Sequence, residues 1–172
     1  TMKSITSACA NKMLRSLEDE KSYWVEKEEL SSTYVAAVGE EPVIPEYDYA
    51  EVSTKIEELD ETICKIKHAL NVSNANAAIS VDGQTMSVDQ ILVRMAQLNR
   101  RKTVLDRMRK RLPKEREGQR MYGSGNAVPE YRYINYDLEQ VKTDYERIAG
   151  KILEMQMALD QYNQTVLFEV EI

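Results

Sequence analysis

The residue types that most often carry chemistry are scarce in this sequence of 172 residues. It has one histidine, His68, and two cysteines, Cys9 and Cys64. Cys64 and His68 are four residues apart, so on a helix they project from one face and could share a metal ion. A zinc site needs about two further ligands, and the Glu-x-x-His spacing of di-metal bundles is absent. We therefore expect packing at this pair, no cofactor, and reduced, partly buried thiols.

Catalytic motifs are equally sparse. A nucleophile triad needs a histidine as general base and an acid that orients it, and a single histidine on a regular helix offers little for such a site. Phosphate-binding loops are Gly-rich and lead into a helix, whereas Gly123-Ser124-Gly125 lacks the next glycine and the helix start. We expect a protein that is not an enzyme.

The sharpest surface feature is a basic run. Residues 100 to 120 hold ten Lys/Arg and three Asp/Glu, so this window carries +7 while the remainder carries −13 and the whole chain −6. Such a patch neutralises phosphates and binds nucleic acid in a salt-sensitive way, and Tyr122, Tyr131 and Tyr133 could add stacking. The candidate nucleic-acid or anion site comprises Arg100, Arg101, Lys102, Arg107, Arg109, Lys110, Arg111, Lys114, Arg116 and Arg120.

The same basic residues have an explanation without nucleic acid. The first half of the chain carries many acids: Glu18, Asp19, Glu20, Glu26, Glu28, Glu29, Glu57, Glu58 and Glu61. In an antiparallel bundle, a basic helix beside an acidic one forms ion pairs. We favour this intramolecular pairing and keep nucleic-acid binding as the alternative.

A second candidate is a group of asparagines at a turn. It comprises Asn71, Asn74, Asn76 and Asn163. Asparagine tolerates left-handed backbone geometry and competes with helical hydrogen bonds through its side chain. We expect these residues to end two helices, with a polar ligand-binding cluster as the alternative.

An internal repeat must position these residues. Residues 47–81 align with residues 136–170 without a gap, and ten of 35 positions are identical, against roughly two expected from ordinary composition. Pro-Glu-Tyr also recurs, at 45–47 and 129–131. A repeated unit of helix, turn and strand predicts one elongated domain with two similar halves, about 1–86 and 87–172, around a pseudo-twofold axis.

Hydrophobic periodicity predicts four helices: 4–30, 48–70, 87–112 and 137–163. Their start signals are Asp48 with Glu51, Ser87 with Gln90 and Asp137 with Gln140, which have the capping-box spacing. The second and fourth helices repeat apolar residues every 3.5 positions, as a coiled-coil seam does. We expect Val52, Ile56, Leu59, Ile63, Ile66 and Leu70 to pack against Val141, Tyr145, Ile148, Ile152, Met155 and Leu159.

The remaining segments are loops and short strands. Residues 31–47 and 113–135 are loops at equivalent places in the two halves. Residues 78–81 read as a strand, Asp82-Gly83 as a tight turn leading back to Met86, and residues 166–172 as a last strand. Because the strands after the second and fourth helices are equivalent, we expect them to pair. The fold class is mainly α: an internally duplicated antiparallel helical bundle or coiled coil with a small antiparallel β element at one end.

Three stretches resemble the septicolysin-like family of small helical bacterial proteins. They are Leu70-Asn-Val-Ser-Asn-Ala-Asn-Ala77, then Asp82-Gly83-Gln-Thr-Met86, and then the helix from Val88 to Leu105. The resemblance covers mainly residues 48–112. It implies an Asn-rich turn, a short Asp-Gly hairpin and a charged third helix, and the family name implies a cytolysin-like role. It assigns no catalytic residues.

Surface and targeting features lead to an expected function. The chain has no apolar run of about 18 residues and no signal-peptide pattern, so we expect a cytoplasmic protein with no membrane contact. The apolar ends of the sheet, with Met155 and Met157, favour homo-oligomerisation. The leading hypothesis is a non-enzymatic assembly or adaptor protein that forms homo-oligomers and binds a partner protein. The alternatives are a nucleic-acid-binding module that uses residues 100–120, and a cytolysin-like role.

Overall fold

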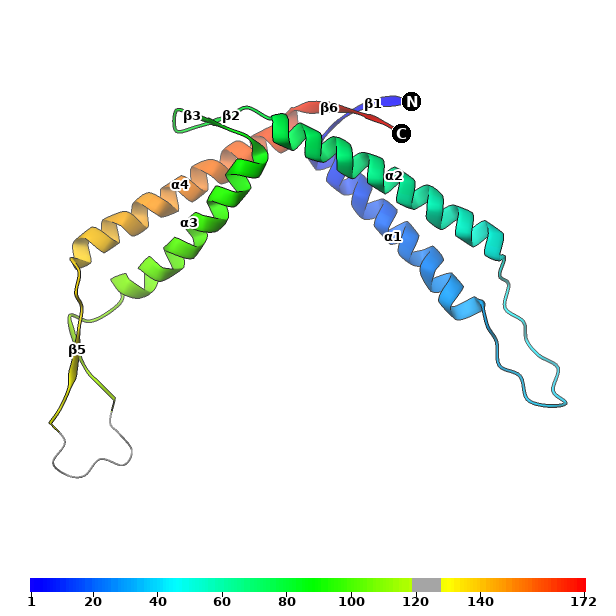
Figure 1. Cartoon of the computed structure of the whole chain (residues 1–172), viewed down its shortest axis with the longest axis horizontal. Coiled ribbons are helices and arrows are strands. Elements are labelled where there is room, and N and C mark those ends of the chain that lie inside the picture. The colour runs from blue at the N-terminus through cyan, green and yellow to red at the C-terminus, as the bar shows by residue number, and fades with distance from the viewer. Residues whose placement is uncertain (119–127) are drawn as a thin grey trace.

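Two long helical hairpins diverge from a common junction in the computed structural model, which describes residues 1–118 and 128–172 (Figure 1). The first arm consists of α1 and α2, and the second arm of α3 and α4. The elements in chain order are β1 (Met2–Thr6), α1 (Ser7–Ser31), α2 (Tyr49–Asn76), β2 (Ile79–Val81), β3 (Gln84–Met86), α3 (Val88–Arg109), β4 (Lys114–Arg116), β5 (Tyr131–Tyr133), α4 (Leu138–Thr165) and β6 (Leu167–Glu171).

Each helix begins at a side chain that accepts a hydrogen bond from its first turn. Thr6 Oγ1 accepts from the Cys9 amide at 3.1 Å and starts α1. Asp48 and Asp137 do the same for α2 and α4. Ser87 forms the complete predicted capping box with Gln90. These caps satisfy backbone N–H groups that a helix start leaves without partners.

The core of the second arm lies between its two helices. Ile91, Leu98 and Leu105 recur every seven residues on α3, and each is at least 96% buried. They face Val141, Ile148, Met155 and Leu159 of α4. The first arm is built in the same way from Ala10 and Leu14 of α1 with Ile63 and Ile66 of α2.

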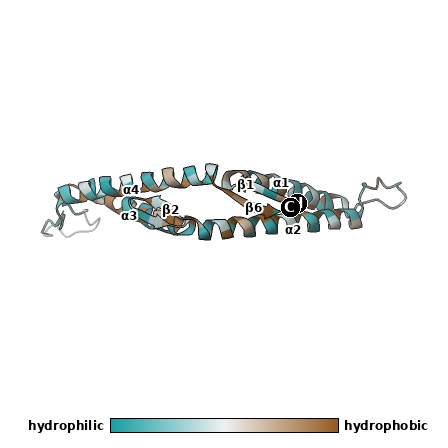
Figure 2. Cartoon of the chain, turned by 90° about the horizontal axis from the view of Figure 1, so that it is seen from above, coloured by the Kyte–Doolittle hydropathy of each residue, from teal (hydrophilic) through white to brown (hydrophobic). Residues whose placement is uncertain are grey.

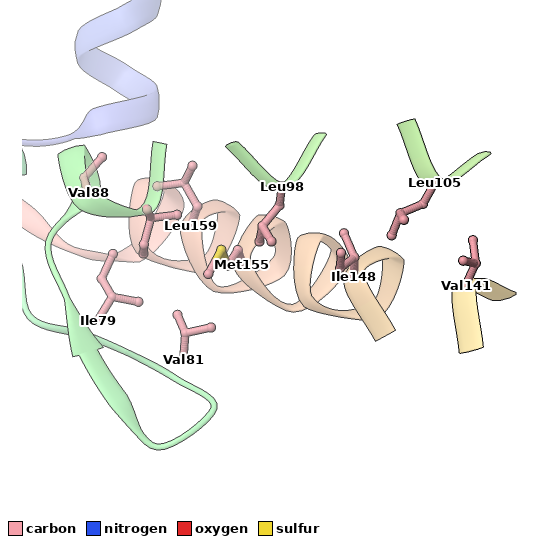
Figure 3. Close-up of a cluster of buried hydrophobic side chains, with 10 residues drawn as sticks. Ile79, Val81, Val88, Leu98, Leu105, Val141, Ile148, Met155 and Leu159 are labelled. Atoms are coloured by element: carbon pink, nitrogen blue, oxygen red, sulfur yellow. The ribbon is translucent and has the colours of Figure 1, made fainter. Parts of the chain in front are cut away.

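Each arm is completed by a strand that follows the helices of the other arm. The side chains of Ile79 and Val81, on β2 directly after α2, lie beside Met155 and Leu159 in the second arm (Figure 3). Conversely, β6 leaves α4 and runs across to the first arm, next to β1 (Figure 2). Val170 of β6 joins the first-arm core. The junction is therefore held together by a reciprocal exchange of strands.

The strands form three antiparallel pairs within the described residues: β1 with β6, β2 with β3, and β4 with β5. The predicted pairing of the strand after α2 with the strand after α4 is therefore wrong. Instead, Ile5 lies opposite Phe168 and Ile79 lies opposite Met86. The predicted turn is confirmed, since Asp82 (φ 50°) and Gly83 (φ 76°) both have positive φ.

The prediction that the apolar seam of α2 packs on that of α4 is also wrong. Ile63 and Ile66 face α1, while Ile148 and Met155 face α3. The seven-residue spacing identified the buried face of each helix correctly, but each hairpin buries that face internally. The small β element accordingly lies at the junction between two arms rather than at the end of one bundle.

Three predicted boundaries differ from the structure. Residues 4–6 belong to β1 rather than to the first helix, because they pair with β6. The second helix continues through the asparagines to Asn76. The third helix ends at Arg109, and the predicted loop 113–135 contains the β4–β5 ribbon. Residues 32–48 contain no strand, so the two arm ends differ in structure.

Candidate functional site

The candidate basic site lies at the free end of the second arm (Figure 1). We call residues 100–118 the basic tip; it comprises the distal half of α3, the turn after it and β4. Seven of its basic side chains are exposed: Arg100, Arg101, Arg107, Lys110, Arg111, Lys114 and Arg116. Lys102 and Arg109 are half-buried. Arg120 and Tyr122 lie outside the described residues.

Asp106 is the acid at the centre of the basic tip. Its Oδ1 accepts from Arg109 Nε at 2.8 Å, and its Oδ2 accepts from Lys110 Nζ at 2.8 Å. These two hydrogen bonds, from Lys110 and Arg109, lower the pKa of Asp106, and the same contact raises the pKa of Arg109. Asp106 is therefore ionised at neutral pH and offsets part of the local positive charge.

Two cations of the basic tip stack on Tyr145 of α4. The guanidinium carbon of Arg109 lies 3.9 Å from the ring centroid and Lys102 Nζ lies 5.8 Å from it. Cations placed over an aromatic face are attracted by its quadrupole. This contact explains why Lys102 occupies a position in α3 where an apolar residue would fit the helical pattern, and it makes Arg109 part of the arm's packing.

The β4–β5 ribbon adds aromatic side chains beside the basic ones. Lys114 Nζ lies 4.3 Å from the Tyr131 ring centroid and 5.8 Å from that of Tyr133. Glu117 accepts from Arg132 Nε at 2.9 Å, and this hydrogen bond lowers the pKa of Glu117. Both tyrosines stay exposed. The ribbon was missed by the sequence prediction, which gives residues 113–135 as a loop; the alternation in Tyr131-Arg-Tyr133 is the signal that could have indicated a strand.

The basic tip does not pair with the acidic helices, and the favoured intramolecular interpretation is wrong for the described residues. The basic tip is at the end of the second arm, whereas those acids lie on the first. The first arm pairs its own charges, with Lys21 Nζ 2.6 Å from Asp60 Oδ1 and Lys67 Nζ 3.4 Å from Glu18 Oε1. The first of these pairs, with a hydrogen bond from Lys21 to Asp60, raises the pKa of Lys21.

The four asparagines are helical and do not form a turn. Asn71, Asn74 and Asn76 lie in the last part of α2, and Asn163 in the last turn of α4. None of the four has a positive φ. Asn71 and Asn76 are exposed, and Asn74 and Asn163 are half-buried. The buried Asn74 Oδ1 has no hydrogen-bond partner in the part of the chain that the structure describes. The two helix ends meet where Tyr162 contacts Ser73.

Two equivalent open grooves flank this meeting point. One, of about 680 Å³, is lined by His68, Ala69 and Asn76 among others. The other, of about 760 Å³, is lined by Met157, Ala158 and Thr165, the residues that align with those three. Both are broad depressions at the junction. The His, Asp and Glu residues that line them are His68 and Glu169 in the first and Asp82, Glu154 and Asp160 in the second.

The cysteines differ from their predicted state in one respect. Cys9 and Cys64 are free thiols, but both are exposed rather than partly buried. His68 is exposed as well. Among the described residues, no three or more His, Cys, Asp and Glu side chains gather into a metal-binding group. None of the described helices combines the length and apolarity needed to cross a bilayer.

Comparison with known proteins defines a fold and nothing more. No family model matches the chain. No curated protein matches it either. A crystal structure of a conserved protein of unknown function from Corynebacterium diphtheriae superposes with a TM-score of 0.61 at 14% identity, covering 96% of this chain and 99% of that one. The two-armed fold is thus shared over nearly the full length. The septicolysin-like resemblance stays a prediction.

Proposed function

We propose that this chain is a non-enzymatic assembly or adaptor protein that works through homo-oligomerisation. The observation that carries the proposal is the surface area. The chain exposes 12903 Å², whereas a compact monomer of 19.8 kDa exposes roughly 8,600 Å². Because each arm is only two helices thick, the chain exposes far more surface than a compact fold of the same mass. Surface of this kind suits contacts with other molecules.

Exposed apolar side chains support the same proposal. Large apolar side chains are exposed in many parts of the chain, including Leu30, Val38, Leu92, Leu153 and Leu167. A hairpin of two helices has only one internal seam, so apolar residues on its other faces cannot be buried within the arm. Association with further chains would cover them.

We also infer that the chain arose by internal duplication, with the Asp82-Gly83 turn between the halves and a coiled-coil seam in each arm. Several observations support this. Apart from the β4–β5 ribbon between α3 and α4, each half has the order strand, helix, helix, strand. Thr6 and Ser87 cap the first helix of each half, while Asp48 and Asp137 cap the second. The exchange of β2 and β6 is reciprocal, as a twofold relation requires.

Light scattering coupled to size exclusion, at low and at high salt with absorbance at 260 and 280 nm, tests the assembly proposal. We expect a discrete mass that is a multiple of 19.8 kDa at low salt, without the absorbance of nucleic acid. A monomer of 19.8 kDa under both conditions would overturn it.

A second candidate function is nucleic-acid binding by the basic tip. Its specific support is that no first-arm acid lies near this tip, and that Tyr131 and Tyr133 are exposed beside Lys114. Bases of single strands stack on such rings while Lys and Arg contact phosphates.

Fluorescence anisotropy with a labelled single-stranded oligonucleotide tests this candidate. Reversing Arg107, Arg111 and Arg116 to Glu should abolish salt-sensitive binding while sparing Arg109, which packs on Tyr145. A matched control reverses Lys3, Lys12 and Arg15, which are exposed on the first arm near the junction. Equal binding by the two variants, or none by the wild type at low salt, would dismiss the candidate.

A further inference from the structure

The two arm ends carry opposite charge. Residues 28–54, which we call the acidic tip, comprise the end of α1, the loop and the start of α2. They contain seven Asp/Glu and no Lys or Arg. The basic tip contains nine Lys/Arg and three Asp/Glu. Because the arms diverge, the two tips lie at opposite ends of the molecule (Figure 1). They cannot meet within one chain in this structure.

The charges of the acidic tip are not neutralised within the described part of the chain. None of its seven acids forms an ion pair there; Glu28 accepts a hydrogen bond from the Tyr47 hydroxyl at 2.8 Å, and Asp48 caps α2. Among the described residues, Arg109 and Lys110 are the only basic side chains of the basic tip that pair with an acid, which is Asp106. Most of the charge at both ends therefore faces solvent.

Apolar side chains accompany the charge at both ends. The large apolar residues that the acidic tip exposes are Leu30, Tyr34, Val35, Val38, Val43, Ile44 and Tyr49, with Val35 and Val38 fully open. The basic tip and its ribbon expose Leu112, Tyr131 and Tyr133. A complementary partner for either end would thus need opposite charge together with apolar surface, and each tip offers this to the other.

We propose that the acidic tip of one copy binds the basic tip of a second copy. This proposal rests on the assembly function proposed above and names its contact. The contact joins two different surfaces of the same chain, so every added copy leaves one acidic and one basic tip open. Contacts of this heterologous kind give closed rings or open strings, depending on the angle between neighbours. Exposed charges carry the attraction, so salt should weaken it.

A second copy fits the observations better than nucleic acid does. Nucleic acid would use the basic tip but would leave the acidic tip and its seven exposed large apolar side chains without a role. A second copy uses both ends and matches them in charge.

Two charge reversals test the contact. The first variant changes Glu40, Glu41 and Glu46 to Lys, and the second changes Arg107, Arg111 and Arg116 to Glu; all six residues are exposed. In the first variant the acidic tip holds four Asp/Glu and three Lys, and the basic tip is unchanged. In the second the basic tip holds six Lys/Arg and six Asp/Glu, and the acidic tip is unchanged. By light scattering at low salt, we expect each alone to be a monomer of 19.8 kDa. We expect an equimolar mixture to form a pair with twice that mass, in which the unchanged basic tip of the first variant binds the unchanged acidic tip of the second.

Matched controls carry the same charge change away from the tips. Asp19, Glu20 and Glu57 are exposed on the first arm and are changed to Lys in one control. Lys3, Lys12 and Arg15 are changed to Glu in the other. Both controls should keep the wild-type mass, and circular dichroism should show native helix in all four variants.

The outcomes separate this inference from the function on which it rests. Assembly by the wild type that persists in both tip variants would overturn the tip contact and leave the assembly proposal standing. A wild-type monomer at low salt that assembles at high salt would overturn the tip contact alone, and a monomer under both conditions would overturn both. Loss of assembly in the tip variants without recovery on mixing would also refute the contact between unlike tips.

Discussion

The hydroxyl of Tyr162 donates a hydrogen bond to the Ser73 carbonyl oxygen at 3.2 Å and lies 3.0 Å from Ser73 Oγ. These two residues hold the same position when residues 47–81 are aligned with residues 136–170. Under the duplication proposed above, two aligned residues that touch each other lie at the axis that relates the two halves. This contact therefore marks the centre of the junction between the arms.

Removing the Tyr162 hydroxyl should loosen the junction. We expect Tyr162→Phe to lower the free energy of unfolding by roughly 0.5–1.5 kcal/mol, the usual net value of a hydrogen bond. Ser73→Ala removes only the side-chain part of the contact. Urea denaturation of both single variants and of the double variant gives their coupling energy. Strictly additive effects would show that the two side chains do not interact.

Because β2 and β6 each pack in the other arm, a substitution in either strand should destabilise the arm that it packs against. Val81→Ala, on the strand after α2, should destabilise the second arm by roughly 2 kcal/mol through lost burial and a cavity. Val170→Ala, after α4, should do the same to the first arm. Hydrogen exchange read by mass spectrometry would show lost protection in α3 and α4 for the first variant and in α1 and α2 for the second. Effects confined to the preceding helix in each case would contradict the exchange.

Two glycines should respond to alanine with opposite signs. Gly83 has φ +76°, so Gly83→Ala should cost roughly 1–2 kcal/mol of strain. Gly150 lies inside α4 with open space around its Cβ position, so Gly150→Ala should add about 0.5–1 kcal/mol of stability. Thermal unfolding measures both. Gly83→Asn is the matched control, because asparagine tolerates positive φ, and it should cost less than alanine.

The contact of Tyr47 with Glu28 should make the stability of the acidic tip depend on pH. Burial, together with the hydrogen bond to Glu28 and its charge, raises the pKa of Tyr47 from 10 to about 12. The folded state therefore favours the neutral hydroxyl, and this stabilisation is full below pH 10 and lost as the pH rises through about 12. The stability difference between wild type and Tyr47→Phe should be constant up to pH 9 and then shrink. A difference that persists to pH 12 would argue against the contact, and Tyr49→Phe controls for an exposed tyrosine.

Local signals made the helices predictable, whereas partners could not be read from the sequence. Ser87 and Asp137 act within one turn of chain, and the Asp82-Gly83 turn depends only on its own backbone. The seven-residue spacing showed which face of α2 is buried. It could not show that α1 covers this face, because apolar side chains fit many neighbours.

The missed elements depend on contacts between distant residues. Met2–Thr6 has only five residues and becomes a strand because β6 lies beside it. The asparagines near the end of α2 favour other conformations, yet the Ser73–Tyr162 contact holds that end in place. The sequence showed the cluster of basic residues within 100–118, whose function stays a prediction. Its separation from the acidic helices follows from the angle between the arms, which no local pattern encodes.

The pairing of Met2 with Glu171 also governs the order in which this chain can fold. On the ribosome β1 is made before the other described elements, yet its partner β6 is made after them. Strand β2, which completes the second arm, is already synthesised when α4 emerges. The first arm is synthesised earlier but must wait for β6, so its closure should be the last and slowest step, since contacts between distant residues form slowly.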